Sequence, residues 1–271
     1  MSGGKVSAYT AWWTAALTLL TAITAVAFWK TSLGAAGEAS ELAGVWIADL
    51  GSILVTGIAA IIVLRTALGF SKGEPFRKYW LLIGIGAACY ALGDIVWALY
   101  ELRGLEVPYP GAPDVFYLAE YAFLAAGLVI AARAYRGLVD EKVPLIVSVA
   151  AAAAAAAGLW AGLLGAIAAD TETALAERAI SIAYPTFDVL FGLAPALFLL
   201  LVVGKLGGGR LARQWWAVGG GLLLLAISDT VYSWMAWNET YVSGSAVDYG
   251  WMLAATAIAM GALLARDLAR A

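Results

Sequence analysis

Aspartates recur in or beside the most apolar parts of this chain, and most of them are followed by an aromatic residue three positions later. On a helix this spacing places the carboxylate and the ring on one face. An ionisable side chain inside a membrane is costly, so several of them facing the interior of a helix bundle predict a functional site. The pairs are Asp94 with Trp97, Asp114 with Tyr117, Asp188 with Phe191, Asp229 with Tyr232 and Asp248 with Trp251; Asp49, followed by Ser52, is the exception.

A carboxylate beside an aromatic ring is suited to binding a cation, an organic amine or a proton, because ring faces attract cations and an apolar setting favours a protonated carboxyl group. The chain has no histidine, which excludes imidazole metal sites, histidine-based catalysis and haem held by histidine. Paired acids alone lack a nucleophile or a phosphate-binding loop, so we expect no enzyme, catalytic residue or metal ligand, and no cofactor is identified. The candidate ligand-binding residues are Asp94, Trp97, Asp114, Tyr117, Tyr121, Asp188, Asp229, Tyr232, Asp248 and Trp251.

The composition is that of an integral membrane protein. Hydrophobic residues make up 63% of the chain and charged residues 13%, and the mean hydropathy is +0.86. The apolar stretch from Ala11 to Trp29 is too long for the core of a signal peptide and predicts a retained first span. Eight segments are long enough to cross a hydrocarbon core of about 30 Å as helices: residues 9–29, 44–69, 77–102, 114–136, 143–167, 180–204, 212–237 and 246–266.

Basic residues gather in alternate connections, which predicts the orientation of the protein. By the positive-inside rule, we expect a multi-pass protein of the cell membrane with both termini in the cytoplasm. All six aspartates then lie toward the outer side, where we expect a pocket that also includes Tyr100 and Trp234. The basic residues are Arg65, Lys72, Arg77 and Lys78, then Arg133, Arg136 and Lys142, then Lys205, Arg210 and Arg213, and finally Arg266 and Arg270.

An internal repeat relates the third and fourth segments to the seventh and eighth. Trp80, Gly84, Gly86, Ala91 and Asp94 match Trp215, Gly219, Gly221, Ala226 and Asp229 at an offset of 135, and Ala112, Asp114, Gly127 and Arg136 match Ala246, Asp248, Gly261 and Arg270 at 134. Units with an even number of spans share one orientation, so we expect a pseudo-twofold axis along the membrane normal. The predicted fold is therefore an all-α integral membrane protein in a single domain, residues 1–271, with four-helix repeats at 1–139 and 140–271.

These features also have structural explanations. An acid in the first turn of a helix is favoured by the helix dipole, which would account for Asp49, Asp114, Asp188 and Asp248. Asp94 and Asp229 sit deeper, where a hydrogen bond to a tyrosine or to the first turn of a neighbouring helix would account for them. Aromatic residues at segment ends are expected from interfacial belts. Close helix packing would explain the small residues Gly84, Gly86, Gly219, Gly220 and Gly221.

The stretch PYPGAPDVFYLAEYAFLAAGL (residues 108–128), with ALGDIVWALYE before it and the echoes AISDTVYSWMAW and SGSAVDYGWML, resembles the multi-span sensory region of bacterial diguanylate cyclases and phosphodiesterases that carry GGDEF and EAL domains. In that family a proline-rich outer turn, an Asp and a Tyr open the fourth helix, as Pro113, Asp114 and Tyr117 do here. The resemblance covers residues 77–136 well and 212–266 in part. It implies a membrane input module; since no catalytic domain follows before Ala271, it also implies a separate output partner or a lost output domain.

The sequence thus favours a sensory, ligand-binding membrane module. A secondary transporter or channel is the main alternative, because duplicated units and membrane carboxylates are typical of transporters. A structural subunit, or a pigment- or lipid-binding subunit of a larger complex, is another. The partners we expect are the lipid bilayer, a small cationic or amine ligand, a cytoplasmic signalling partner and, in a homodimer, a second copy of the chain; we expect no nucleic acid.

Overall fold

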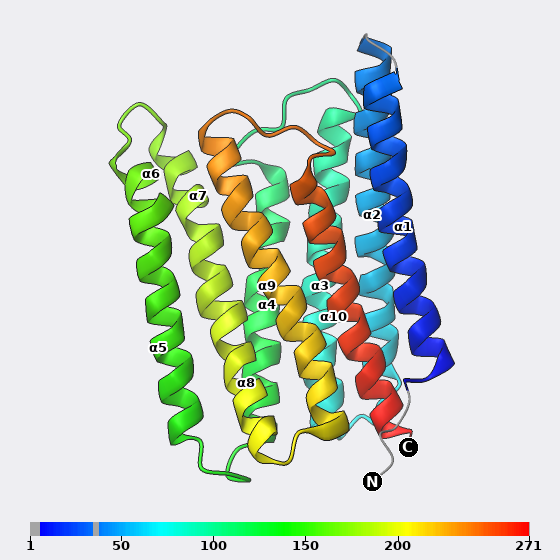
Figure 1. Ribbon diagram of the computed structural model, residues 1–271, viewed down its shortest axis with the longest axis vertical. Coiled ribbons are helices and arrows are strands. Elements are labelled where there is room, and N and C mark those ends of the chain that lie inside the picture. Colours follow the sequence, from blue (N-terminus) through cyan, green and yellow to red (C-terminus); the bar gives the residue numbers. More distant parts are fainter. Residues whose placement is uncertain (1–5, 35–37, 271) are drawn as a thin grey trace.

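The computed structural model describes residues 6–34 and 38–270, and within them it forms a bundle of membrane-length helices (Figure 1). All eight expected spans are present, and most begin and end within a few residues of the predicted positions. The sixth differs most, since it begins at Leu175 rather than near residue 180. The helices are α1 (Ala8–Gly34), α2 (Glu38–Leu68), α3 (Pro75–Glu101), α4 (Ala112–Ala134), α5 (Lys142–Leu159), α6 (Gly165–Ala169), α7 (Leu175–Phe187), α8 (Ala194–Lys205), α9 (Gly209–Trp237) and α10 (Ala246–Ala269).

The fifth and sixth spans each contain a short π-helical segment. In the fifth span, η1 (Trp160–Leu164) joins α5 to α6; in the sixth, η2 (Asp188–Leu193) joins α7 to α8. Pro185 lies in the last turn of α7 and Pro195 in the first turn of α8. Neither proline can donate a backbone hydrogen bond, which accounts for a wider turn between them.

The described parts of α1 and α10 bring the two ends of the chain to the same end of the bundle (Figure 1). Asp267 in α10 accepts hydrogen bonds from the Ser7 hydroxyl at 2.8 Å and from the Thr10 hydroxyl at 2.8 Å. The connections that follow α2, α4 and α8 lie at this end too, so the basic residues collect here. We call it the basic end and the opposite one the distal end.

Aromatic side chains fill the centre of the bundle toward the basic end. Trp80 in α3 and Trp215 in α9 are fully buried, and their rings stack with centroids 6.1 Å apart and planes inclined by 9°. Tyr79 is equally buried and lies 5.7 Å from the Trp80 ring and 5.6 Å from the Trp215 ring. This packing closes the interior at the basic end and leaves the distal end for the candidate site.

Glycines allow close approach of α3 to α4 and of α9 to α10. A Cβ atom on Gly86 would lie 3.2 Å from the backbone oxygen of Glu120, and one on Gly221 would lie 2.8 Å from that of Ala254. These contacts confirm the packing explanation for these two glycines. Gly84 and Gly219 likewise face leucine side chains, whereas Gly220 has no neighbour within 4 Å of such an atom.

Candidate functional site

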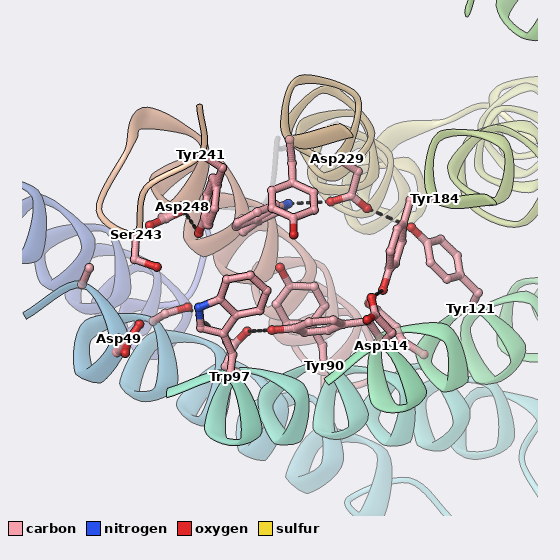
Figure 2. Close-up of a pocket in the computed structure, with 17 residues that line it drawn as sticks. Asp49, Tyr90, Trp97, Asp114, Tyr121, Tyr184, Asp229, Tyr241, Ser243 and Asp248 are labelled. Carbon is pink, nitrogen blue, oxygen red and sulfur yellow. Dashed lines mark hydrogen bonds between the residues drawn. The ribbon is translucent and has the colours of Figure 1, made fainter. Parts of the chain in front are cut away.

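Nine of the ten candidate residues line one cavity toward the distal end, which we call the large cavity (Figure 2). The empty space inside it amounts to about 750 Å³, counting its open mouth. Asp188 is the candidate that does not line it, and the expected lining residues Tyr100 and Trp234 are not part of it either. The full lining is Ala48, Asp49, Ser52, Tyr90, Asp94, Trp97, Asp114, Tyr117, Glu120, Tyr121, Tyr184, Asp229, Tyr232, Tyr241, Ser243, Asp248 and Trp251.

Figure 2 shows the acids on two sides of this cavity. Asp49 and Asp248 lie on one side with Ser243 and Tyr241, and Asp114 and Asp229 lie on the other with Tyr184 and Tyr121. Among the described residues that line the cavity there is no lysine or arginine. The cavity therefore offers acidic and aromatic groups without an internal counter-charge.

Asp94 in α3 is held by three hydroxyl groups from neighbouring helices. Its Oδ2 accepts hydrogen bonds from Ser52 at 3.0 Å and Thr56 at 2.8 Å, both in α2, and its Oδ1 accepts one from Tyr117 in α4 at 3.0 Å. The buried hydrogen bond expected from the structural explanation is thus present. A carboxylate with three donors can also remain charged in a buried place.

Asp229 in α9 has a similar arrangement with ring donors. Trp251 in α10 donates its indole N–H to Oδ1 at 2.6 Å, and Tyr121 in α4 donates its hydroxyl to Oδ2 at 2.9 Å. In the sequence, Tyr117 follows Asp114 and Trp251 follows Asp248 at the three-residue spacing, but each ring binds an aspartate of the preceding span. The shared helix face was predicted, and so was a tyrosine as a partner of these deeper aspartates; which ring binds which aspartate was not.

Asp114 and Asp248 lie in the first turns of α4 and α10, as their structural explanation predicts. The backbone N–H of Gly111 donates to Asp114 Oδ2 at 2.6 Å, and the backbone N–H of Gly244 donates to Asp248 Oδ2. The second oxygen of each carboxylate accepts a hydrogen bond from a tyrosine hydroxyl. These are Tyr184 to Asp114 at 2.5 Å and Tyr241 to Asp248 at 2.9 Å.

For Asp49 and Asp188 the helix-start explanation is wrong. Asp49 lies 11 residues after Glu38, where α2 begins, and Asp188 lies 13 residues after Leu175, where α7 begins. At about 1.5 Å per residue these distances exceed two helical turns. Asp188 is 3% exposed and lies behind Tyr121, so it supports the wall of the cavity and does not face the cavity itself.

Tyr121 connects the two aspartates of this wall. Its hydroxyl oxygen lies 2.9 Å from Asp188 Oδ1 and 2.9 Å from Asp229 Oδ2. A hydroxyl carries one hydrogen and can donate it to one acceptor at a time. Both contacts are therefore hydrogen bonds only when one of the carboxyl groups supplies a second hydrogen.

Glu120 differs from the four hydrogen-bonded aspartates of the cavity, whereas Asp49 resembles it in having an oxygen, Oδ2, that is buried without a hydrogen-bond partner. Glu120 is 6% exposed, and within the described part of the chain no donor lies within hydrogen-bonding distance of its carboxyl group. It also lines a second, smaller cavity, which we call the small cavity and whose empty space amounts to about 380 Å³ when its open side is counted. At the repeat offset of 134 its counterpart is Ala254, and Glu120 is not one of the candidate residues chosen from the sequence. The small cavity is lined by Thr56, Ala59, Val63, Ala87, Tyr90, Glu120, Leu225, Trp251, Ala254, Ala255 and Ile258.

Four of the rings that line the large cavity form a cluster, comprising Trp97, Tyr232, Tyr241 and Trp251. Ring centroids are 5.8 Å apart for Trp97 and Tyr241, 4.8 Å for Tyr232 and Tyr241, and 5.5 Å for Tyr232 and Trp251. Tyr241 comes from the loop before α10, where burial and the nearby Asp248 carboxylate raise the pKa of its hydroxyl well above the usual value. Tyr241 therefore stays a neutral hydrogen-bond donor at ordinary pH.

Other lining residues had no sequence signal. Tyr184 follows no aspartate at the three-residue spacing, and Tyr241 and Ser243 lie in a loop. Within residues 6–34 and 38–270, no three His, Cys, Asp or Glu side chains are placed to hold a metal ion together. The acids of the cavity are thus spread around its wall.

Fold and site together define a multi-pass helical membrane protein with an acidic and aromatic cavity between its helices. Comparison with known proteins adds no relative: no family model, no curated protein and no solved structure matches this chain.

Proposed function

We propose that the protein is a membrane ligand-binding module of the sensory kind and that it binds a small organic cation in the large cavity. The observation that carries this proposal is the lining, in which five aspartates and Glu120 stand beside a cluster of aromatic rings, with no lysine or arginine among the described lining residues. Ring faces attract ammonium groups, most strongly where water is excluded. A bound cation would supply the positive charge that this wall does not contain.

An organic cation suits the site better than a metal ion. The carboxylates of Asp94, Asp114, Asp229 and Asp248 each accept hydrogen bonds from at least two donors. A metal ion would need several of these oxygens to turn toward one point. An ammonium ion in contact with ring faces requires no such rearrangement.

The tandem four-helix repeats, residues 1–139 and 140–271, are also part of this proposal. Equivalent positions make equivalent contacts: a Cβ on Gly127 would lie 3.0 Å from the backbone oxygen of Tyr79, and one on Gly261 would lie 3.0 Å from that of Gln214. The stacked pair Trp80 and Trp215 and the bonds of Tyr117 to Asp94 and of Trp251 to Asp229 fall at matched positions too. These contacts support a pseudo-twofold axis along the membrane normal.

We further propose that the basic end faces the cytoplasm of the cell, which would open the large cavity toward the outside. The first turns of α4 and α10 lie beside the cavity and carry Asp114 and Asp248, and their last turns carry Arg133 and Arg266 at the basic end. A ligand that shifts the packing of these helices would be felt there by a cytoplasmic partner or an attached output domain. The resemblance to sensory regions of GGDEF and EAL proteins agrees with this direction of signalling.

A transporter is the second candidate, because the small cavity continues inward from Glu120. Apart from Thr56 and the three residues that it shares with the large cavity, its lining is aliphatic. Beyond it, Tyr79, Trp80 and Trp215 are fully buried and fill the interior. This closed end favours a receptor over an open route.

Thermal unfolding in lipid nanodiscs tests cation binding. We expect tetramethylammonium chloride to raise the melting temperature, because a ligand that binds only the folded state stabilises it, and we expect sodium chloride and tert-butanol at equal concentration not to do so. The double variant Asp94→Asn plus Asp229→Asn should lose the shift. The control, Asp140→Asn plus Glu172→Gln, changes exposed acids outside the cavity and should keep it. Equal shifts in both double variants would remove Asp94 and Asp229 from the site.

A further inference from the structure

Building on the proposed function, we propose that the ligand is an alkylammonium ion whose charged group pairs with Glu120 and whose alkyl chain enters the small cavity. This assigns a ligand class and an orientation within the site. It depends on how Glu120, Tyr90 and Trp251 are shared between the two cavities.

Glu120 is the acid that both cavities share, and its acceptor capacity is free for a ligand; Asp49 also has a buried oxygen without a partner, Oδ2, but it lines the large cavity alone. Asp94 has three hydrogen-bond donors, and Asp229, Asp114 and Asp248 have two each. Glu120 is more than nine-tenths buried, lines both cavities, and has no donor within the described part of the chain. A buried carboxylate without a partner is costly, and an ammonium ion provides both a charge and N–H donors.

The small cavity can accept hydrocarbon but little else. Thr56 is the polar residue of its inner wall. The Thr56 hydroxyl already donates to Asp94 at 2.8 Å and lies 2.9 Å from the backbone oxygen of Ser52. A polar substituent would find few partners there. The remaining wall is apolar and consists of Ala59, Val63, Ala87, Leu225, Ala254, Ala255 and Ile258.

The two cavities meet where the two halves of the bundle differ. Glu120 in α4 and Ala254 in α10 occupy matched positions of the proposed repeats, and both line the small cavity. One half therefore supplies the carboxylate, while the other supplies a methyl group and leaves space beside it. Tyr90 and Trp251 complete this boundary and place aromatic rings next to the expected position of the ammonium group.

With the alkyl chain of the ligand in the small cavity, the binding affinity should depend on the length of that alkyl chain. Each methylene buried from water should strengthen binding by about fourfold, so propylammonium should bind about fifteenfold more tightly than methylammonium. The gain should end when the chain fills the small cavity. Hexanol and hexanoate should bind weakly, because neither carries the cation that Glu120 pairs with.

Calorimetric titration of nanodisc-embedded protein tests this proposal with methylammonium, propylammonium and hexylammonium chloride, after subtraction of empty-disc titrations. Glu120→Gln, which removes the charge and keeps the shape, should weaken binding of all three by at least about tenfold. Ala255→Leu fills the small cavity without touching the large one and should abolish the chain-length gain while methylammonium still binds. Ala153→Leu, on an exposed face of α5, is the matched control and should keep the gain.

The outcomes separate this inference from the proposed function. If methylammonium binds but the chain-length gain is absent, or persists in Ala255→Leu, the orientation is wrong and cation binding in the large cavity stands. If Glu120→Gln binds as tightly as the natural protein, Glu120 is not the anchor. If no ammonium ion binds the natural protein, the proposed function itself fails. Should Ala255→Leu not fold, Ala87→Leu fills the same cavity from α3 and has to give the same loss.

Discussion

The hydroxyl of Tyr117 in α4 donates a hydrogen bond to Asp94 in α3 at 3.0 Å, across a helix interface at the wall of the large cavity. This bond joins two residues that sequence analysis selected separately. It shows that the acids of the cavity belong to the packing of the bundle and also face its hollow. Substitutions here should therefore affect stability and binding to different degrees.

Tyr117→Phe removes one of the three donors to Asp94 and leaves the ring in place. We expect the free energy of unfolding to fall by about 1 kcal/mol, because Ser52 and Thr56 still donate. Denaturant titration in mixed micelles measures this change. Tyr9→Phe, at a half-exposed ring near the basic end, is the control and should have little effect; a loss as large in Tyr9→Phe would refute the assignment.

Trp215→Ala should be among the most destabilising single changes. Trp215 is fully buried against Trp80 and Tyr79, and loss of such a side chain costs about 3 to 5 kcal/mol. Its neighbour Trp216 is 68% exposed, so Trp216→Ala should cost less than about 1 kcal/mol. The same titration compares the two variants, and similar losses would show that the interior at the basic end is not packed as described.

Asp170, in the loop between α6 and α7, should make the stability of the fold depend on pH under acidic conditions. The Trp237 indole N–H at 2.8 Å and the Thr173 hydroxyl at 2.7 Å hold the pKa of this carboxyl below its ordinary value. A lowered folded-state pKa adds stability above the unfolded-state value, and this stability is lost as pH falls toward the folded-state value. The difference in melting temperature between the natural protein and Asp170→Asn should thus be present at pH 7 and shrink below about pH 4. A difference that stays constant with pH would contradict this role.

A receptor and a transporter should differ in the flux of a bound cation across the membrane. In proteoliposomes, a receptor with a closed basic end should show no sustained counterflow of labelled methylammonium above protein-free vesicles. The reason is the buried packing of Tyr79, Trp80 and Trp215. Sustained counterflow that Glu120→Gln abolishes would favour the transporter instead.

The membrane class and the eight spans could be predicted because apolar length and composition determine whether a helix can cross a bilayer. The start of the sixth span was misplaced because Glu177 and Arg178 interrupt the apolar pattern. In the structure the Arg178 side chain donates to the backbone oxygen of Ala168 in α6 at 3.0 Å, so its charged group has a partner near the start of α7.

Most of the cavity could be predicted, because a three-residue spacing fixes which side chains share a face of one helix. The choice of inter-helical partner could not, since it depends on how neighbouring helices are rotated and packed. The spacing paired Tyr117 with Asp114, whereas the packed helices pair it with Asp94. Glu120 lacked an acidic repeat counterpart, and its unsatisfied carboxyl group is visible only in the packed structure.

The most direct test of cation binding is an experimental structure of the protein determined with saturating tetramethylammonium. We predict density for the cation in the large cavity, within about 6 Å of the ring centroids of at least two of Tyr90, Trp97, Tyr232, Tyr241 and Trp251. A cavity that contains only water under these conditions would contradict it.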